Sequence, residues 1–165
     1  MKQLVSMKAR IAPLLLFVGS VQACDFDCTL QRHLQALESH DWAAFEATLG
    51  KQQLPLILPN GALSLDGKSY RDLLQPWFAE GGWTFKAKEL HREVGSDLAL
   101  VLLDVDYDEA DRGGKPYHLD HYLSLVFRNT DGEWRLVFDQ NTSQPPPKPE
   151  PANEANAADA RTNAD

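Results

Sequence analysis

The sequence contains few of the features that mark nucleic-acid-binding, disulfide-rich or membrane-spanning proteins. Only two of its 165 residues are cysteine, which excludes a Cys-rich zinc module and a disulfide-dense mini-protein. Acidic residues outnumber basic ones, and the net charge of −8 argues against nucleic acid, whose phosphates attract a basic surface. The apolar run over residues 11–21 is well below the ~20 residues that a membrane-spanning helix needs. We therefore expect no nucleic-acid partner and no transmembrane span.

Residues 1–23 have the layout of a secretory signal peptide. Three basic residues come first, the apolar run follows, and the small residue Ala23 ends it. Cleavage after Ala23 would leave Cys24 as the first residue of a periplasmic or secreted protein. Two fates of Cys24 stay open. It forms a disulfide with Cys28 in an oxidising compartment, or, because the letters VQAC resemble a lipobox, it carries a lipid anchor.

Residues 144–165 have the composition of a disordered tail. They are rich in Pro, Ala and Asn and contain no large apolar side chain. Such a segment cannot bury enough surface to offset the entropy lost on ordering. We therefore expect one folded domain over residues 24–143, between the signal peptide and this tail.

The first half of that domain has helical periodicity, and the second half has the periodicity of strands. Apolar side chains spaced three or four residues apart, together with capping residues, predict the helices. Those helices are expected over residues 29–38, 42–49 and 69–80, the last one capped by Ser69. Short apolar segments at 54–58 and 62–65, joined by a Pro-Asn-Gly turn, predict two paired strands. From residue 83 onward apolar and polar residues alternate, as in long antiparallel strands.

The last predicted hairpin assigns side chains to two faces of a strand. Strict alternation puts Trp134, Leu136 and Phe138 on one face. It puts Asp139 and Asn141 on the opposite face. Trp134 is the clearest candidate for the core.

Helices followed by a run of antiparallel strands predict an α+β fold. Residues 98–103 are apolar at consecutive positions, so both faces of this strand are expected to be covered. Helices can cover one face, and a second copy of the chain is the obvious cover for the other. We therefore expect a homodimer that forms through the outer face of the sheet.

The order of these elements resembles the SnoaL-like branch of the nuclear transport factor 2-like superfamily. The resemblance is carried by HLQALESHDWAAFEATL, by the LILPNG strand and turn, by the pair Trp77-Phe78 and by the closing hairpin VFRNTDGEWRLVFDQNT. It implies a cone, in which a curved antiparallel sheet wraps around helices and leaves a pocket, commonly in a dimer. The superfamily includes isomerases, cyclases, dehydratases, binding proteins and assembly modules, so the resemblance implies no single function.

The best-understood enzymes of the superfamily are the ketosteroid isomerases, which use a carboxylate base together with a tyrosine and a neutral acid. Alignment on the P-x-G turn places the base position at Leu58, a hydrocarbon that cannot accept a proton. The acid position falls near Ser124, and the tyrosine position falls at His33. We therefore do not expect the steroid-isomerase reaction.

Three further patterns have plainer explanations than a chemical site. Asp120, Arg135 and Asp139 could be taken for the Asp–Arg–Asp group of a limonene-epoxide-hydrolase type site, but cross-strand ion pairs explain them equally well. In the segment HLDH at 118–121, alternation puts His118 and Asp120 on one face of the strand and His121 on the other, so these three possible metal ligands do not converge. The acidic segment 104–111 lacks the glycine and the final glutamate of a calcium loop. We expect no metal and no other cofactor.

These observations predict an exported protein that binds a small, partly apolar molecule without turning it over. We predict that the wall of its pocket includes His33, Asn60, Trp77, Tyr122, Ser124, Arg135 and Asp139. One alternative is a lyase, isomerase or hydrolase that uses His33 or Asp120 as its base. A second alternative is an assembly or accessory module without a pocket.

Overall fold

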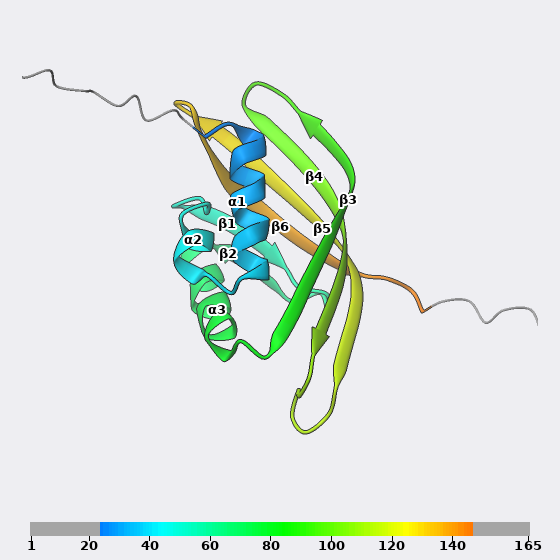
Figure 1. Cartoon of the computed structure of the whole chain (residues 1–165). Coiled ribbons are helices and arrows are strands. Elements are labelled where there is room, and N and C mark those ends of the chain that lie inside the picture. Colours follow the sequence, from blue (N-terminus) through cyan, green and yellow to red (C-terminus); the bar gives the residue numbers. More distant parts are fainter. Residues whose placement is uncertain (1–23, 147–165) are drawn as a thin grey trace, which may run out of the picture.

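The computed structural model describes residues 24–146 (Figure 1). The predicted signal peptide and the segment 147–165 of the predicted tail lie outside the described residues. Gln144, the first residue assigned to the tail, is tied to the domain because its backbone N–H donates to the carbonyl oxygen of Asp120 over 2.9 Å.

Three helices pack on one side of the molecule: α1 (Phe26–Glu38), α2 (Trp42–Glu46) and α3 (Gly67–Glu80). Each begins after an aspartate whose carboxylate accepts a hydrogen bond from the backbone of the first turn, which satisfies an otherwise unpaired N–H. Helix α3 begins two residues before its predicted start. Asp66, not Ser69, is its N-cap, and it accepts from the backbone N–H of Ser69 over 2.9 Å.

Six strands form a single curved sheet in the order β2-β1-β6-β5-β4-β3. Their bounds are β1 Gln53–Ile57, β2 Leu63–Asp66, β3 Trp83–Val94, β4 Leu98–Glu109, β5 Tyr117–Thr130 and β6 Glu133–Ser143. All neighbours are antiparallel except β1 and β6, which are parallel. The expectation of a purely antiparallel sheet was wrong for that pair.

A bulge in β6 changes which side chains face the helices. Val126 pairs with Phe138 and Phe127 pairs with Leu136, so Val137 is an extra residue with no partner on β5. Because side chains alternate between faces, the extra residue turns Phe138 outward and Asp139 inward. The predicted alternation, which put Phe138 on the same face as Trp134 and Leu136, was therefore wrong beyond Leu136.

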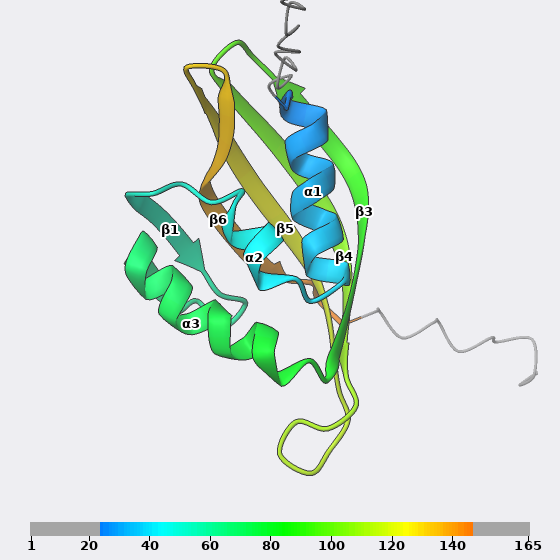
Figure 2. The same ribbon diagram turned by 60° about the vertical axis from the view of Figure 1, so that its left-hand side comes forward.

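The helices cover the concave face of the sheet, and the core lies between the two layers (Figure 2). Trp134 is buried as predicted. The α+β cone, with helices on the concave face of a curved sheet, is confirmed. Within residues 24–146, none of the helices combines the length and the apolar character that crossing a bilayer requires.

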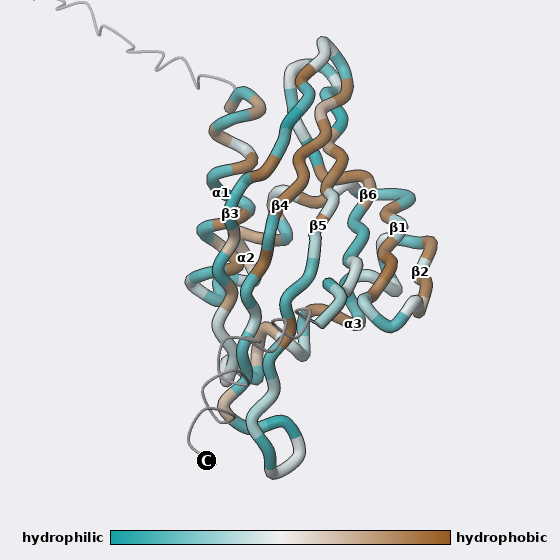
Figure 3. The backbone as a smooth tube through the Cα atoms, turned by 90° about the vertical axis from the view of Figure 1, so that its right-hand side faces the viewer, coloured by the Kyte–Doolittle hydropathy of each residue, from teal (hydrophilic) through white to brown (hydrophobic). Residues whose placement is uncertain are grey.

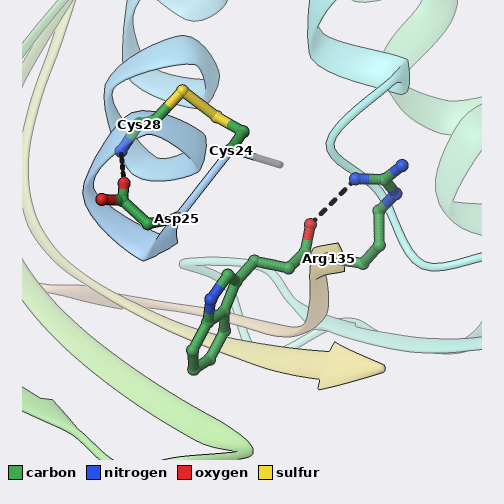
Figure 4. Close-up of a disulfide and its surroundings, with 5 residues drawn as sticks. Cys24, Asp25, Cys28 and Arg135 are labelled. Carbon is green, nitrogen blue, oxygen red and sulfur yellow. Dashed lines mark hydrogen bonds between the residues drawn. A yellow bond between two sulfur atoms is a disulfide. The ribbon is translucent and has the colours of Figure 1, made fainter. Parts of the chain in front are cut away.

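Cys24 and Cys28 are joined by a disulfide at the start of α1 (Figure 4). The backbone N–H of Cys28 also donates to the carboxylate of Asp25 over 2.9 Å. Nearby, the side chain of Arg135 turns back to donate to the carbonyl oxygen of Trp134 over 3.0 Å.

Candidate functional site

A cavity of about 550 Å³ lies between the helices and the concave face of the sheet. Its wall is mostly apolar and aromatic, and it reaches the molecular surface at the exposed side chains of Asn60, Leu73 and Arg112. Pockets of this size and lining are typical of sites for small molecules. The polar groups that face such a cavity determine what it can hold.

Asp139 is the acidic group of the cavity. The bulge turns it inward from β6, where it is 7% exposed. Its carboxylate accepts one hydrogen bond from the Tyr70 hydroxyl over 2.8 Å and one from the Asn141 side-chain amide over 2.9 Å. Burial raises the pKa of Asp139 to about 6, although both hydrogen bonds act in the opposite direction. The group can therefore gain or lose a proton close to neutral pH.

Tyr70 is fixed as a neutral hydrogen-bond donor to this carboxylate. The side chain projects from α3 and is fully buried. Burial, followed by the nearby charge of Asp139, raises the pKa of Tyr70 well above its ordinary value. Its hydroxyl thus stays protonated and holds the carboxylate in place.

His33, on α1, is the second polar group of the cavity wall and is 1% exposed. Its Nδ1 lies 2.8 Å from the Thr48 hydroxyl oxygen. That hydroxyl donates its own hydrogen to the carbonyl oxygen of Phe45 over 2.6 Å, so it must accept from Nδ1–H. This network assigns the tautomer and leaves Nε2 as an acceptor. Burial lowers the pKa of His33 to about 3, so the ring is neutral.

His121, on β5, also lines the cavity and is 4% exposed. Its Nδ1 is buried without a hydrogen-bond partner among residues 24–146. Burial lowers the pKa of this ring, so it too is neutral at pH 7. A buried imidazole nitrogen without a partner costs free energy unless a bound molecule or water satisfies it.

An aromatic and ionic network borders the cavity where α3 meets the β4–β5 hairpin. The indole N–H of Trp77 donates to the Tyr107 hydroxyl over 2.9 Å, and that hydroxyl donates to Glu109. Arg112 is paired with the same carboxylate, and its guanidinium lies 3.6 Å from the ring centre of Tyr117. The positive charge of Arg112 is therefore already paired with Glu109.

Four of the predicted wall residues line the cavity: His33, Asn60, Trp77 and Asp139. Three do not. Tyr122 and Ser124 point to the outer face of β5, and Arg135 lies on the outer face of β6, because they alternate with inward side chains. Of the two predicted bases, His33 lines the cavity and Asp120 lies on the outer face.

Sequence reasoning missed the partners of these groups. Tyr70, Asn141 and Thr48 were not singled out, and His121 was considered only as a metal ligand. Alternation places Asn141 on the same face as Asp139, and that shared face is the signal that could have identified Asn141 as a partner of the carboxylate.

The outer face carries a different group of polar side chains. Ligand atoms of Asp106, Asp108 and His118 lie within 4.8 Å of one another. His118 Nδ1 is 2.9 Å from Asp108, and the hydrogen bonds to Asp108 and Asp120 raise the pKa of His118. All of these side chains are about half exposed, and this is the arrangement of a surface ion-pair cluster. His121 points to the other face, as alternation predicted.

Comparison with known proteins identifies the family. The model of the SnoaL-like domain matches residues 28–145. The chain belongs to the SnoaL-like family. Comparison of the sequence with curated proteins gives no match.

Solved structures share the SnoaL-like fold at low sequence identity. An uncharacterised protein with a cystatin-like fold from Caulobacter vibrioides superimposes with a TM-score of 0.63 at 12% identity, over 82% of this chain and 94% of that one. An NTF2-like protein from Cytophaga hutchinsonii superimposes with a TM-score of 0.56 at 14% identity, over 70% of this chain and 93% of that one. An LEH-like epoxide hydrolase from M. tuberculosis superimposes with a TM-score of 0.53 at 18% identity, over 70% of this chain and 80% of that one. At these identities the likeness establishes the fold alone.

The SnoaL-like cavity differs from the ketosteroid isomerase pattern implied by the resemblance. Leu58, at the expected base position, does line the cavity, and it offers no proton acceptor there. Ser124, at the expected acid position, faces away from the cavity. The carboxyl that does face the cavity, Asp139, comes from β6.

Proposed function

We propose that this protein binds a small, mostly apolar molecule in the cavity between the helices and the sheet. The observation that carries the proposal is the cavity itself: about 550 Å³ of largely apolar space with a few polar groups on its wall. A well-packed interior would have favoured an assembly module without a pocket. The best-known reaction of this superfamily needs a carboxylate base, and Leu58 stands at the position of that base.

Native mass spectrometry of the purified protein tests this proposal. We expect a co-purified small molecule, or saturable binding of added 2-naphthalenemethanol. Leu58→Trp puts a large side chain into the cavity and is expected to abolish binding. Leu65→Trp is the matched control, because Leu65 is 62% exposed on β2 and does not line the cavity. Equal binding by both variants would contradict the proposal.

Asp139 favours a second candidate function, that of an enzyme that adds a proton to its ligand or removes one from it. A carboxyl with a pKa of about 6 can act as general acid or general base near neutral pH. Such an enzyme would convert the bound molecule to a product of different mass or structure, and Asp139→Asn would stop the conversion. An unchanged ligand after prolonged incubation with wild-type protein supports binding without turnover.

We also propose that the protein is exported to the periplasm or secreted. The signal-like composition of residues 1–23 supports export, and so does the Cys24–Cys28 disulfide, because such bonds persist in oxidising compartments. The mass spectrum of the intact chain tests this at the same time. A mass that starts at Cys24 with an intact disulfide is expected, and a diacylglyceryl mass would support the lipoprotein alternative.

A homodimer through the outer face of the sheet is part of the proposal. Figure 3 shows the single chain from the side of this face, with the backbone coloured by the hydropathy of each residue. Leu100, Val126 and Phe138 are paired in register across β4, β5 and β6 and form an apolar row on this face. We call the row and its neighbours the outer apolar patch, which consists of Leu98, Leu100, Leu102, Tyr122, Val126 and Phe138. Leu98, Leu100 and Tyr122 are exposed, and Leu102, Val126 and Phe138 are partly exposed. Contiguous apolar side chains that water can reach mark interaction surfaces.

A further inference from the structure

We infer that the molecule bound in the cavity is an apolar amine, held in its ammonium form against Asp139. The inference rests on the proposed binding function and names the chemical class of the ligand. Three features of the cavity support it: an unbalanced buried charge, free hydrogen-bond acceptors, and aromatic walls.

The first feature is the charge of Asp139, which has no cationic partner among residues 24–146. Its carboxylate appears in none of the ion pairs of that part of the chain. The groups that donate to it, Tyr70 and Asn141, are neutral. Arg112 lines the same cavity, but it is already paired with Glu109. A buried carboxylate without a counter-charge is costly, and a ligand ammonium would supply that charge.

The second feature is the balance of donors and acceptors. A carboxylate offers about four lone-pair positions, and Asp139 uses two of them, so it can accept further hydrogen bonds. His33 presents Nε2 as an acceptor because Nδ1 carries the hydrogen. The Tyr70 hydroxyl is not free to donate to a ligand, because it is committed to Asp139. An ammonium group, with three N–H donors, matches this wall, whereas a ketone or a carboxylate brings only acceptors.

The third feature is the aromatic lining. The rings of Trp77, Tyr107 and Tyr117 belong to the cavity wall, and so do those of Phe45 and Tyr70, which are almost fully buried. Aromatic faces attract cations and also accommodate an apolar body. The net charge of −8 adds a long-range attraction for cationic ligands and a repulsion for anionic ones.

A set of probes with one carbon skeleton and different polar ends tests the inference. We would measure the binding of 2-naphthylmethylamine, its N-acetyl derivative, 2-naphthalenemethanol and 2-naphthoate by isothermal titration at pH 8. The amine is expected to bind about tenfold or more tightly than the alcohol or the acetamide, because it alone brings a positive charge against the Asp139 carboxylate. Naphthoate is expected to bind most weakly.

Asp139→Asn keeps the shape of the side chain and removes its charge, so it is expected to reduce amine binding to the level of the alcohol. Asp120→Asn is the matched control, because it removes one negative charge from the outer face and leaves the cavity intact. Circular dichroism establishes that each variant is folded. The comparison of amine with acetamide uses wild-type protein only, so it tests the inference even if Asp139→Asn does not fold.

The failure of the inference differs from the failure of the proposed function. If the alcohol binds as tightly as the amine, or Asp139→Asn keeps the preference for the amine, the ligand class is wrong. If, in that case, Leu58→Trp still abolishes binding of the alcohol, the proposed function stands. If none of the four probes binds to wild-type protein and no small molecule co-purifies with it, both are contradicted.

Discussion

His33 and Asp139, two of the buried ionisable side chains of the cavity, respond to pH in opposite directions. The pKa of His33 is lowered by burial from 6.5 to about 3, so below pH 6.5 the unfolded chain binds a proton that the folded chain does not. Its contribution to stability is therefore lost as the pH falls. The pKa of Asp139 is raised by burial from 3.8 to about 6. Its contribution is present at low pH and is lost as the pH rises towards 6.

Replacement of His33 separates these two effects. Asn at position 33 has an amide that can still donate to Thr48, but it does not titrate. Each pH unit below 6.5 lowers the free energy of unfolding by about 1.4 kcal/mol, because the unfolded chain binds a proton at His33 and the folded chain does not. Between pH 7 and pH 5 this loss amounts to about 2 kcal/mol. We expect His33→Asn to lack this loss, as measured by urea unfolding at the two pH values.

His91→Asn serves as the control for this measurement. His91 is a half-exposed histidine of β3, and its replacement is expected to leave the acid-dependent loss in place. Because every variant retains Asp139, the effect of that carboxyl cancels in the comparison. The same acid-dependent loss in wild-type protein and in His33→Asn would show that His33 is not the group responsible.

At the scale of elements, the sequence pattern predicts the type of each helix and strand because that depends on local periodicity. The heptad-like spacing in α1 and the alternation in β4 and β5 are properties of neighbouring residues. The bulge at Val137 is not a property of neighbouring residues, because it depends on how β6 pairs with β5. The parallel pairing of Leu56 with Asp139 joins residues more than 80 positions apart, and no local signal contains it.

The end of α3 offers a prediction that depends on backbone conformation alone. Gly81 ends the helix with φ of 61°, in the left-handed region, and a Cβ placed there would meet no other atom within 4 Å. A side chain at this φ costs about 1–2 kcal/mol. Gly81→Ala is therefore expected to lower the free energy of unfolding by about 1 kcal/mol, as measured by urea unfolding at pH 7.

The neighbouring Gly82 provides a matched control for that prediction. A Cβ at Gly82 also meets nothing within 4 Å, and the residue does not have a positive φ. Gly82→Ala should leave stability unchanged or raise it slightly, because alanine reduces the freedom of the unfolded chain. If both variants lost the same stability, conformation at Gly81 would not be the cause.

At the scale of the whole molecule, the site was predicted in part because the cone brings distant segments together. His33, Asn60, Trp77 and Asp139 come from four different elements or turns, and the family resemblance indicated that these segments surround one pocket. One of the errors came from an assumed alignment. Ser124 was chosen from the ketosteroid isomerase pattern although its alternation with Leu123 and Leu125 already put it on the outer face.

The outer face also leads to a prediction about the assembly. Leu100 lies in the apolar row between β4 and β6 and is 38% exposed in the single chain. If a second copy covers this row, a charge within it would be buried without a partner. Leu100→Lys is therefore expected to weaken the dimer by about 30-fold or more, the effect typical of an interface hot spot.

Light scattering coupled to size-exclusion chromatography, over a range of concentrations, measures this change. Wild-type protein is expected to elute with twice the mass of one chain, and Leu100→Lys with the mass of one. Leu65→Lys is the control, because Leu65 is a more exposed leucine on β2, at the opposite edge of the sheet from β3, and lies outside the outer apolar patch. Since both variants add one positive charge, a difference between them depends on position and not on net charge. A wild-type protein that stays monomeric at every concentration would contradict the homodimer, and the outer apolar patch would then need a different partner.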